Sequence, residues 1–447
     1  DVYIVVEPFK DPKIQTKFPQ EKTAARTKAN VPIRKELYGE ETGKGKKWTY
    51  ISRERSLKTN GDASMVTKER IVKCAESIVT GMSLKRGEAV VIRGGTHTQE
   101  LLEEIGILCY KKGAQPIIMA TTDNYSARVY DEIPKETLEI TPKHYLGAIR
   151  EADVYIVVEP FKDPKIQTKF QQEKIAARTK ANVPVRKELY GEETGKGKKW
   201  TYAGWPTKEA AKFYSIDYND LERLIIEGIM VPASALKEKT SKLAEHLREK
   251  DVLRITDKKG TNFTCKIKGR CINEDDGIVD DHDIEMNDLG NNLPAGEVFI
   301  APDETFGEGT LYCPITIDRF TNKIIKDVTL HFEDGRLLLD ECTAGVNRDQ
   351  MIDTFKRCLE VDKKEKEVRT THIAELGIGC NPAIDMAIGY ILTDEKLGGS
   401  VHVAFGSNFS YGGTSKSSMH WDFVTHPSAT IKTVDTEEVI MKDGELL

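Results

Sequence analysis

The chain has 447 residues, which is too long for one ordinary domain and favours two or three. Its formal net charge is −6, and acidic and basic residues are interleaved throughout, so neither nucleic acid nor a membrane surface is favoured as a partner. The eight cysteines form no CxxC pair and no apolar run reaches the ~20 residues of a membrane span, so we expect a cytoplasmic protein with reduced thiols.

The start of the chain duplicates an internal segment. Asp1–Tyr50 matches Asp153–Tyr202 except at three positions. Solenoid repeats diverge and recur at least three times, which this pair does not. The first copy also lacks the helical pattern that precedes the second copy at His144–Ala152. We therefore expect residues 1–64 to be an extension that packs poorly and Met65–Leu447 to be the functional unit. The alternative is that each copy forms a domain of its own.

Helical and strand patterns alternate between Met65 and residue 250. Helices are predicted at Lys68–Met82, Gln99–Lys112 and over most of Lys208–Leu247, and strands at Glu88–Ile92, Gln115–Ala120 and Val154–Glu159. Such alternation predicts an α/β domain with a mixed or parallel sheet and helices on its faces.

The pattern changes from about Asp251 to the end of the chain. Strands are predicted at Leu253–Thr256, Asn262–Gly269 and Lys326–Phe332, and helices at Asp349–Val361 and Ala383–Leu392. We expect residues 251–447 to form an α+β domain that is rich in antiparallel strands.

Four apolar segments of this second domain contain isolated polar side chains. Glu297 and Glu375 lie in such segments, where burial of a carboxylate costs several kcal/mol unless it is paired or bound to a metal. His402 lies inside an apolar strand pattern. His420 and Asp422 are two residues apart, so on a strand they point to the same face. Mixtures of imidazole and carboxylate suit zinc, cobalt, manganese or iron(II), so the sequence predicts a metal site in this domain.

The four segments, in this order, resemble the aminopeptidase T and aminopeptidase S family of metallopeptidases. The resemblance covers Met65–Leu447 and is clearest in the second domain. The matching motifs are Pro-x-x-Glu-Val-Phe at Pro294–Phe299, Gly-Glu-Leu at Ala374–Leu376, Asp-Glu-Asn at Asp394–Lys396 followed by His-x-Ala-x-Gly at His402–Gly406, and His-x-Asp at His420–Asp422.

The resemblance implies an enzyme that removes N-terminal amino acids from peptides. It also implies a homodimer and two divalent metal ions, which would be zinc, cobalt or manganese. The implied metal ligands are Glu297, Glu375, His402, His420 and Asp422. A carboxylate that is not fully used in ligation, Glu297 or Glu375, would carry the proton to the leaving amine.

The sequence departs from the family pattern at two informative positions. The family has a tyrosine seven residues after the strand histidine, where this chain has Phe409. Tyr411 is the nearest replacement as a hydrogen-bond donor in the active site, and the alternative is that it is a tyrosine of a surface loop. The third residue of the Asp-Glu-Asn motif is Lys396.

Two other functions remain open from the sequence. His402, His420 and Asp422 would also supply the two histidines and one aspartate of an iron(II) ring-cleaving dioxygenase of the dihydroxypyridine type, which shares this fold family. The third possibility is a binding protein without metal. The number and identity of the bound metals distinguish the three.

Overall fold

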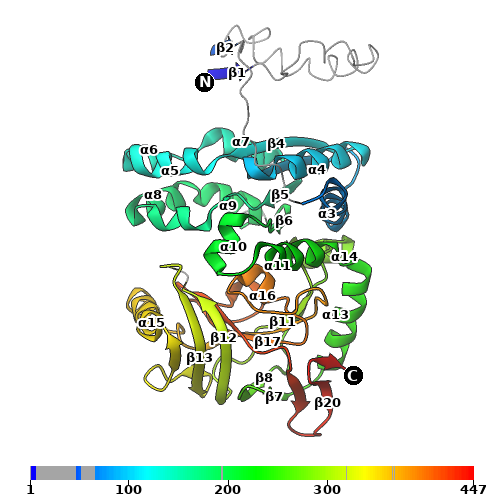
Figure 1. Cartoon of the computed structure of the whole chain (residues 1–447), viewed down its shortest axis with the longest axis vertical. Helices are drawn as coiled ribbons and strands as arrows, with labels where there is room; N and C mark the ends of the chain where they lie inside the picture. Colours follow the sequence, from blue (N-terminus) through cyan, green and yellow to red (C-terminus); the bar gives the residue numbers. More distant parts are fainter. Residues whose placement is uncertain are drawn as a thin grey trace. The chain divides into compact units, whose positions relative to one another are not determined.

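The computed structural model describes residues 2–6, 47–51, 66–192, 195–318, 320–364, 366 and 368–447 (Figure 1). The chain divides into two compact units, Asp1–Ala63 and Ser64–Leu447. Within the described ranges, no helix has both the length and the apolar character needed to cross a membrane.

The first unit contains strands β1 (Val2–Val6) and β2 (Lys47–Ile51), which pair in parallel. Their register repeats that of the duplicated segment: Val2 lies opposite Lys47, as Val154 lies opposite Lys199. The surroundings of the two pairs differ. The later pair lies inside a five-stranded sheet, whereas β1 and β2 form a sheet of two strands, an arrangement that is marginally stable alone.

A parallel sheet forms the first part of the larger unit (blue to green in Figure 1). Its strands, in spatial order, are β10 (Gly290–Leu293), β6 (Lys199–Ala203), β5 (Val154–Val158), β3 (Ala89–Gly95) and β4 (Gln115–Thr121). The helices of this part are α3 (Lys68–Gly81), α4 (Gln99–Lys111), α5 (Asp123–Glu132), α6 (Lys135–Leu138), α7 (Lys143–Glu151), α8 (Gln172–Ala181), α9 (Val183–Tyr190), α10 (Lys208–Tyr214), α11 (Tyr218–Glu222), α12 (Gly228–Met230) and α13 (Ala233–Leu247), with the 3-10 helices η2 (Thr96–Thr98) and η3 (Pro164–Lys169) and the π-helix η4 (Arg223–Glu227).

The helices of this part follow the apolar spacing of the sequence. In α3, Thr67 caps the first turn by accepting a hydrogen bond from the amide of Arg70, and Ile71, Ala75 and Ile78 are buried along one face. Strand β10 was not predicted. It comes from the later part of the chain and completes the edge of the parallel sheet, so the two parts are joined by backbone hydrogen bonds.

Two antiparallel sheets form the second part (mostly yellow to red in Figure 1). The larger sheet contains β14 (Arg336–Leu337), β13 (Ile324–Glu333), β12 (Gly309–Ile317), β8 (Asn262–Lys266), β7 (Val252–Thr256), β19 (Thr430–Thr433), β20 (Val439–Lys442) and β21 (Glu445–Leu446), with β15 (Thr343–Val346) paired to β13. The five-stranded antiparallel sheet contains β18 (His420–Val424), β17 (Val401–Gly406), β16 (Ile373–Gly379), β11 (Glu297–Ile300) and β9 (Ile272–Asp275). The helical elements are α14 (Asp281–Met286), α15 (Arg348–Asp362), α16 (Ile391–Asp394) and η5 (Phe409–Tyr411). The predicted fold class, an α/β part followed by a part rich in antiparallel strands, is confirmed.

The predicted helix Ala383–Leu392 is wrong. Only Ile391–Asp394 is helical, and most of the residues before it are irregular backbone with bends. Gly389 adopts a positive φ of 86°, which ends any helix at this point. The backbone amides of Ile388 and Gly389 donate to the carboxylate of Asp394 instead of to helical carbonyls. Local side-chain hydrogen bonds therefore replace the expected helix.

The duplication provides a matched test of whether residues 1–64 contribute to stability. Ile156 is fully buried in the centre of β5, and its counterpart in the first copy is Ile4. We predict that Ile156→Asp lowers the free energy of unfolding by more than about 4 kcal/mol, because it buries an unpaired charge. Ile4→Asp, and a chain that starts at Met65, should keep the wild-type melting temperature within about 5 °C. An equal loss from the two aspartate variants in thermal melts would contradict this prediction.

Candidate metal centre

One face of the five-stranded antiparallel sheet is polar, whereas the other belongs to the hydrophobic core. In β18, His420 and Asp422 alternate with Trp421 and Phe423, because successive side chains of a strand point to opposite faces. The core face of the sheet is formed by Val298, Ile300, Leu376, Ile378, Val401, Val403, Phe405, Trp421 and Phe423. The intervening positions place the five predicted ligands, Glu297, Glu375, His402, His420 and Asp422, on the opposite face.

A glycine on β16 makes room for one of the imidazoles. Gly377 lies directly opposite His402 in the register of β16 and β17. A Cβ atom on Gly377 would lie 2.0 Å from Cε1 and from Nε2 of His402. The ring of His402 therefore lies over the backbone of β16, and only glycine permits this approach. The same packing directs Nε2 of His402 toward Glu375, at 3.2 Å from its Oε1.

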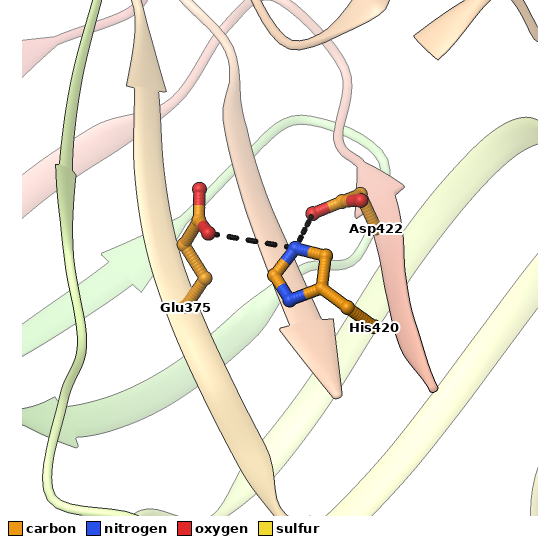
Figure 2. Close-up of side chains that lie close together, drawn as sticks. All are labelled: Glu375, His420 and Asp422. Carbon is orange, nitrogen blue, oxygen red and sulfur yellow. Dashed lines mark hydrogen bonds and ion pairs between the residues drawn. The ribbon is translucent and has the colours of Figure 1, made fainter. Parts of the chain in front are cut away.

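Glu375, His420 and Asp422 form the tightest group of possible ligands (Figure 2). The Nε2 atom of His420 lies 3.1 Å from Oδ1 of Asp422 and 3.5 Å from Oε2 of Glu375. One ligand atom from each of the three residues lies within 4.8 Å of the others. In the part of the chain that the structure describes, no other three His, Cys, Asp or Glu side chains meet in this way.

The hydrogen bonds of His420 suit a metal ligand. Its Nδ1 lies 2.8 Å from the carbonyl oxygen of Ser407, which accepts a hydrogen bond and so keeps a proton on Nδ1. The lone pair of the neutral ring is then on Nε2, which faces the two carboxylates. Metal-binding histidines generally donate their other ring N–H to a carbonyl or carboxylate in this manner. The donor set of one imidazole and two carboxylates therefore fits a divalent cation.

Without a cation, both imidazoles of the centre retain protons. Burial lowers the pKa of His420, but Asp422 and Glu375 outweigh this effect and raise it to about 10. Burial likewise lowers the pKa of His402, and the hydrogen bond with Glu375 and the charge of Glu297 raise it to about 9. The buried carboxylates are thus stabilised by nearby positive charge, which a metal ion can supply in place of a proton on the imidazole.

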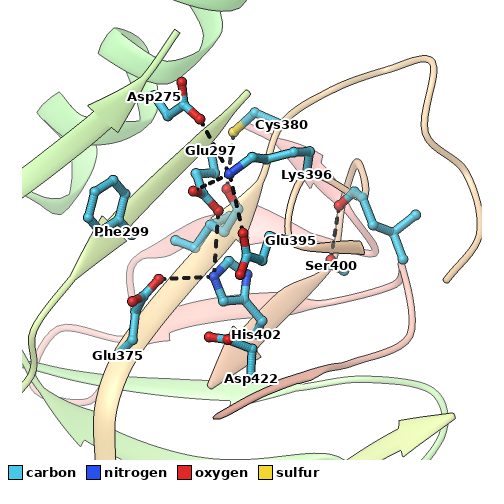
Figure 3. A network of polar contacts seen from close by, with 12 residues as sticks. Asp275, Glu297, Phe299, Glu375, Cys380, Glu395, Lys396, Ser400, His402 and Asp422 are labelled. Carbon is cyan, nitrogen blue, oxygen red and sulfur yellow. Dashed lines mark hydrogen bonds and ion pairs between the residues drawn. The ribbon is translucent and has the colours of Figure 1, made fainter. Parts of the chain in front are cut away.

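His402 and Glu297 lie beside this group, on the side of β11 (Figure 3). Nε2 of His402 is 3.5 Å from Oε2 of Glu297, and Nδ1 of the same buried ring has no hydrogen-bond partner among the described residues. The sheet thus brings together all five residues that the resemblance implies as ligands. They nevertheless form two sets that share Glu375, and only the set with His420 and Asp422 has converging ligand atoms.

Two further residues of the site, Lys396 and Asp275, were not predicted from the sequence. The Lys396 side chain is fully buried, and its ammonium contacts Glu297, Asp275 at 3.3 Å and Glu395 at 3.5 Å (Figure 3). Burial alone lowers the pKa of Lys396, but the three carboxylates raise it above the usual value overall. Asp275 faces Glu297 directly across β9 and β11, where two carboxylates without a cation would repel each other.

The sequence contains a signal that Lys396 is unusual, but none for Asp275. Lys396 replaces the asparagine of the Asp-Glu-Asn motif, so the change from a neutral to a cationic residue marked the position. Asp275 lies in the segment Glu274–Gly277, which has the composition of a solvated turn. Nothing local separates Asp275 from its acidic neighbours, and only the strand register assigns it to the site.

Tyr411 is part of the candidate metal centre, whereas Phe409 lies outside it. The Tyr411 hydroxyl is 3.3 Å from Nδ1 of His420, and its ring contacts Phe299 with centroids 5.6 Å apart. Burial and the neighbouring charge and hydrogen bond of Glu375 raise the pKa of Tyr411, so the hydroxyl remains protonated and able to donate. Phe409 is 60% exposed and packs against the ammonium of Lys416.

A buried carboxylate anchors the loop that carries Tyr411. Oε1 of Glu304 accepts hydrogen bonds from the amide of Thr414 at 2.6 Å and from Asn408 at 3.0 Å. Oε2 accepts from Arg270 at 2.8 Å. Burial raises the pKa of Glu304, but these hydrogen bonds outweigh it and lower the pKa to about 2. The carboxylate thus holds both ends of the turn around Tyr411.

Comparison with known proteins identifies the family. A family model described as thermophilic metalloprotease (M29) matches residues 67–446, and the chain belongs to this family. The resemblance noted in the sequence and the predicted class, a metal-dependent hydrolase, are thereby confirmed. No curated protein matches the sequence.

Two solved structures are similar in fold. Wild-type AmpT from Thermus thermophilus has a TM-score of 0.66 and 20% sequence identity, over 86% of this chain and 100% of that chain. The 2,5-dihydroxypyridine dioxygenase from Pseudomonas putida KT2440 has a TM-score of 0.53 and 14% identity, over 86% of this chain and 98% of that chain.

We predict that His420→Ala and Asp422→Ala each abolish tight binding of a metal ion, because each removes one of the three converging ligands. The measurement is elemental analysis of folded protein after dialysis against the metal. His426→Ala is the matched control, since this histidine pairs with Ser428 outside the centre. Full metal content in the His420 and Asp422 variants would contradict the assignment.

We predict that Glu304→Gln lowers the free energy of unfolding by about 1–3 kcal/mol near neutral pH, because an amide cannot accept from all the donors that surround it. The depressed pKa gives the sign of the pH dependence. The carboxylate contributes fully above its unfolded pKa of ~4.3 and loses this contribution as the pH falls toward 2. The difference between wild type and variant in urea unfolding should therefore shrink from pH 6 to pH 3. Glu308→Gln, at an exposed position, is the control. A constant difference would contradict the role of the carboxylate charge.

Proposed function

We propose that this protein is a metal-dependent aminopeptidase that removes N-terminal amino acids from peptides. The observation that carries the proposal is the convergence of Glu375, His420 and Asp422 in a member of a metalloprotease family. The fold similarity to AmpT agrees with this reading. We infer zinc, cobalt or manganese from the donor set. The homodimer and the cytoplasmic location expected from the sequence stay predictions.

The residues of the centre suit peptide hydrolysis. A divalent metal bound there would lower the pKa of a water molecule and polarise the scissile carbonyl. Glu375 has one oxygen facing each imidazole, at 3.2 Å from His402 and 3.5 Å from His420. One oxygen can therefore serve as a ligand while the other accepts a proton and passes it to the leaving amine. Glu297, the other carboxylate considered for this role, is held by Lys396.

Tyr411 suits the role of a donor to the developing oxyanion. Its hydroxyl lies beside His420, and its loop is held by Glu304, so the donor is positioned before the substrate binds. A preorganised donor stabilises charge that appears only in the transition state. Tyr411 would thereby replace the tyrosine that the family has at the position of Phe409.

A second candidate is an iron(II) ring-cleaving dioxygenase. The fold similarity to the dihydroxypyridine dioxygenase supports it, and His402, His420 and Asp422 would be its ligands. The convergence of Glu375, rather than His402, with the other two residues favours the peptidase.

Hydrolysis of leucine p-nitroanilide tests the proposed function. Metal-free protein should be inactive and should regain activity with zinc, cobalt or manganese. The N-acetylated substrate is the control, because an aminopeptidase requires the free α-amine. Absence of hydrolysis with every metal, together with oxygen consumption in the presence of iron(II) and a dihydroxypyridine, would reject the peptidase in favour of the dioxygenase.

We predict that Tyr411→Phe lowers kcat about 10-fold or more with unchanged metal content, which corresponds to ~1.4 kcal/mol or more of lost transition-state stabilisation. Phe409→Leu is the control, because the ring of Phe409 is 60% exposed and packs against Lys416. If kcat of Tyr411→Phe equals that of the wild type, another group is the donor.

A further inference from the structure

The centre contains a positive charge that belongs to the chain itself. Lys396 is one of the largest fully buried side chains of the protein, and its ammonium lies among Glu297, Asp275 and Glu395. The backbone holds the residue in place: its amide donates to Thr393 and its carbonyl accepts from Asn381, both at 3.0 Å. The flanking Leu397 is also fully buried. The side chain of Lys396 is therefore shielded from solvent.

The Lys396 ammonium is paired with Glu297, the carboxylate that a second metal ion would need as a ligand. One oxygen of Glu297 pairs with Lys396, and the other lies 3.5 Å from Nε2 of His402. A divalent cation between Glu297 and His402 would share Glu297 with the ammonium. Two cations this close repel each other strongly in a buried site, where water does not screen them.

The arrangement of the ligand atoms agrees with this exclusion. Among the described residues, the converging group contains Glu375, His420 and Asp422 but neither Glu297 nor His402. We propose that Lys396 takes the place of a second metal ion, so that the protein binds one catalytic metal at Glu375, His420 and Asp422. This inference rests on the proposed function only in requiring a catalytic metal at this centre.

The consequence is a centre with one metal ion and one ammonium group. An ammonium donates hydrogen bonds to oxygen atoms but offers no empty orbital to a nitrogen lone pair. The α-amine of a peptide therefore cannot bind at Lys396 as it would bind to a second metal. Lys396 also neutralises Asp275 and Glu297, which face each other across β9 and β11. Its replacement by a neutral residue leaves a pair of carboxylates that a metal ion can bridge.

Metal titration of the full chain tests the inference. Chelator-treated protein is titrated with Co²⁺ or Zn²⁺ in a calorimeter, and the bound metal is counted by elemental analysis after gel filtration. The wild type should bind one equivalent. Lys396→Asn should bind two, because it removes the ammonium and restores the residue of the family motif. Lys268→Asn, at an exposed lysine, is the control and should bind one.

Each outcome bears on the inference. Two tight equivalents in the wild type, or one in a folded Lys396→Asn, overturn it. A wild type that binds no metal rejects the proposed function and the inference together, whereas one equivalent without peptide hydrolysis rejects only the function. If Lys396→Asn does not fold, Glu297→Gln gives the answer. This variant should still bind one equivalent, because Glu297 is not a ligand of the single metal, and loss of that metal overturns the inference.

Discussion

The crowding of carboxylates on one face of a sheet is the constraint on which the rest of this structure depends. Asp275, Glu297, Glu375, Glu395 and Asp422 lie within one network, and none has more than 18% of its side chain exposed. So much buried negative charge is unstable without nearby positive charge. Lys396 provides part of the positive charge, and a proton on His420 or a metal ion in its place can provide more at Glu375 and Asp422. The proposed metal-dependent hydrolysis follows from this need for positive charge beside the carboxylates.

The opposite face of the same sheet gives the centre its rigidity. Trp421 and Phe423 alternate with His420 and Asp422 on β18 and stack on Phe355 of α15, with centroids 5.4 and 6.3 Å away. Both His420 and Asp422 are thus flanked by residues packed in the core, which limits how far their side chains can move. The loop with Tyr411 needs a separate anchor, because it leaves the sheet after β17, and Glu304 provides it.

The sequence was sufficient for features that depend on local pattern. The alternation around His420 and Asp422 predicted a shared face, and the isolated acids Glu297 and Glu375 marked buried polar positions. Features that depend on strand order could not be predicted from the sequence. Strand β10 pairs with the parallel sheet although it lies far along the chain, and Asp275 is placed opposite Glu297 only by the register of β9 and β11. The segment Ala383–Leu392 has helical spacing, but Gly389 and the Asp394 carboxylate override it. Lys396 was visible as a departure from a motif, yet its role required the three carboxylates to be placed around it.

The presence of a single metal ion at Glu375, His420 and Asp422 is tested most directly by a crystal structure of the zinc- or cobalt-loaded protein, with anomalous difference maps at the metal edge. We expect one strong peak, at about 2.0–2.2 Å from Nε2 of His420 and from oxygens of Asp422 and Glu375. The ammonium of Lys396 should remain on Glu297. A peak between Glu297 and His402, or no peak near His420, would contradict this expectation.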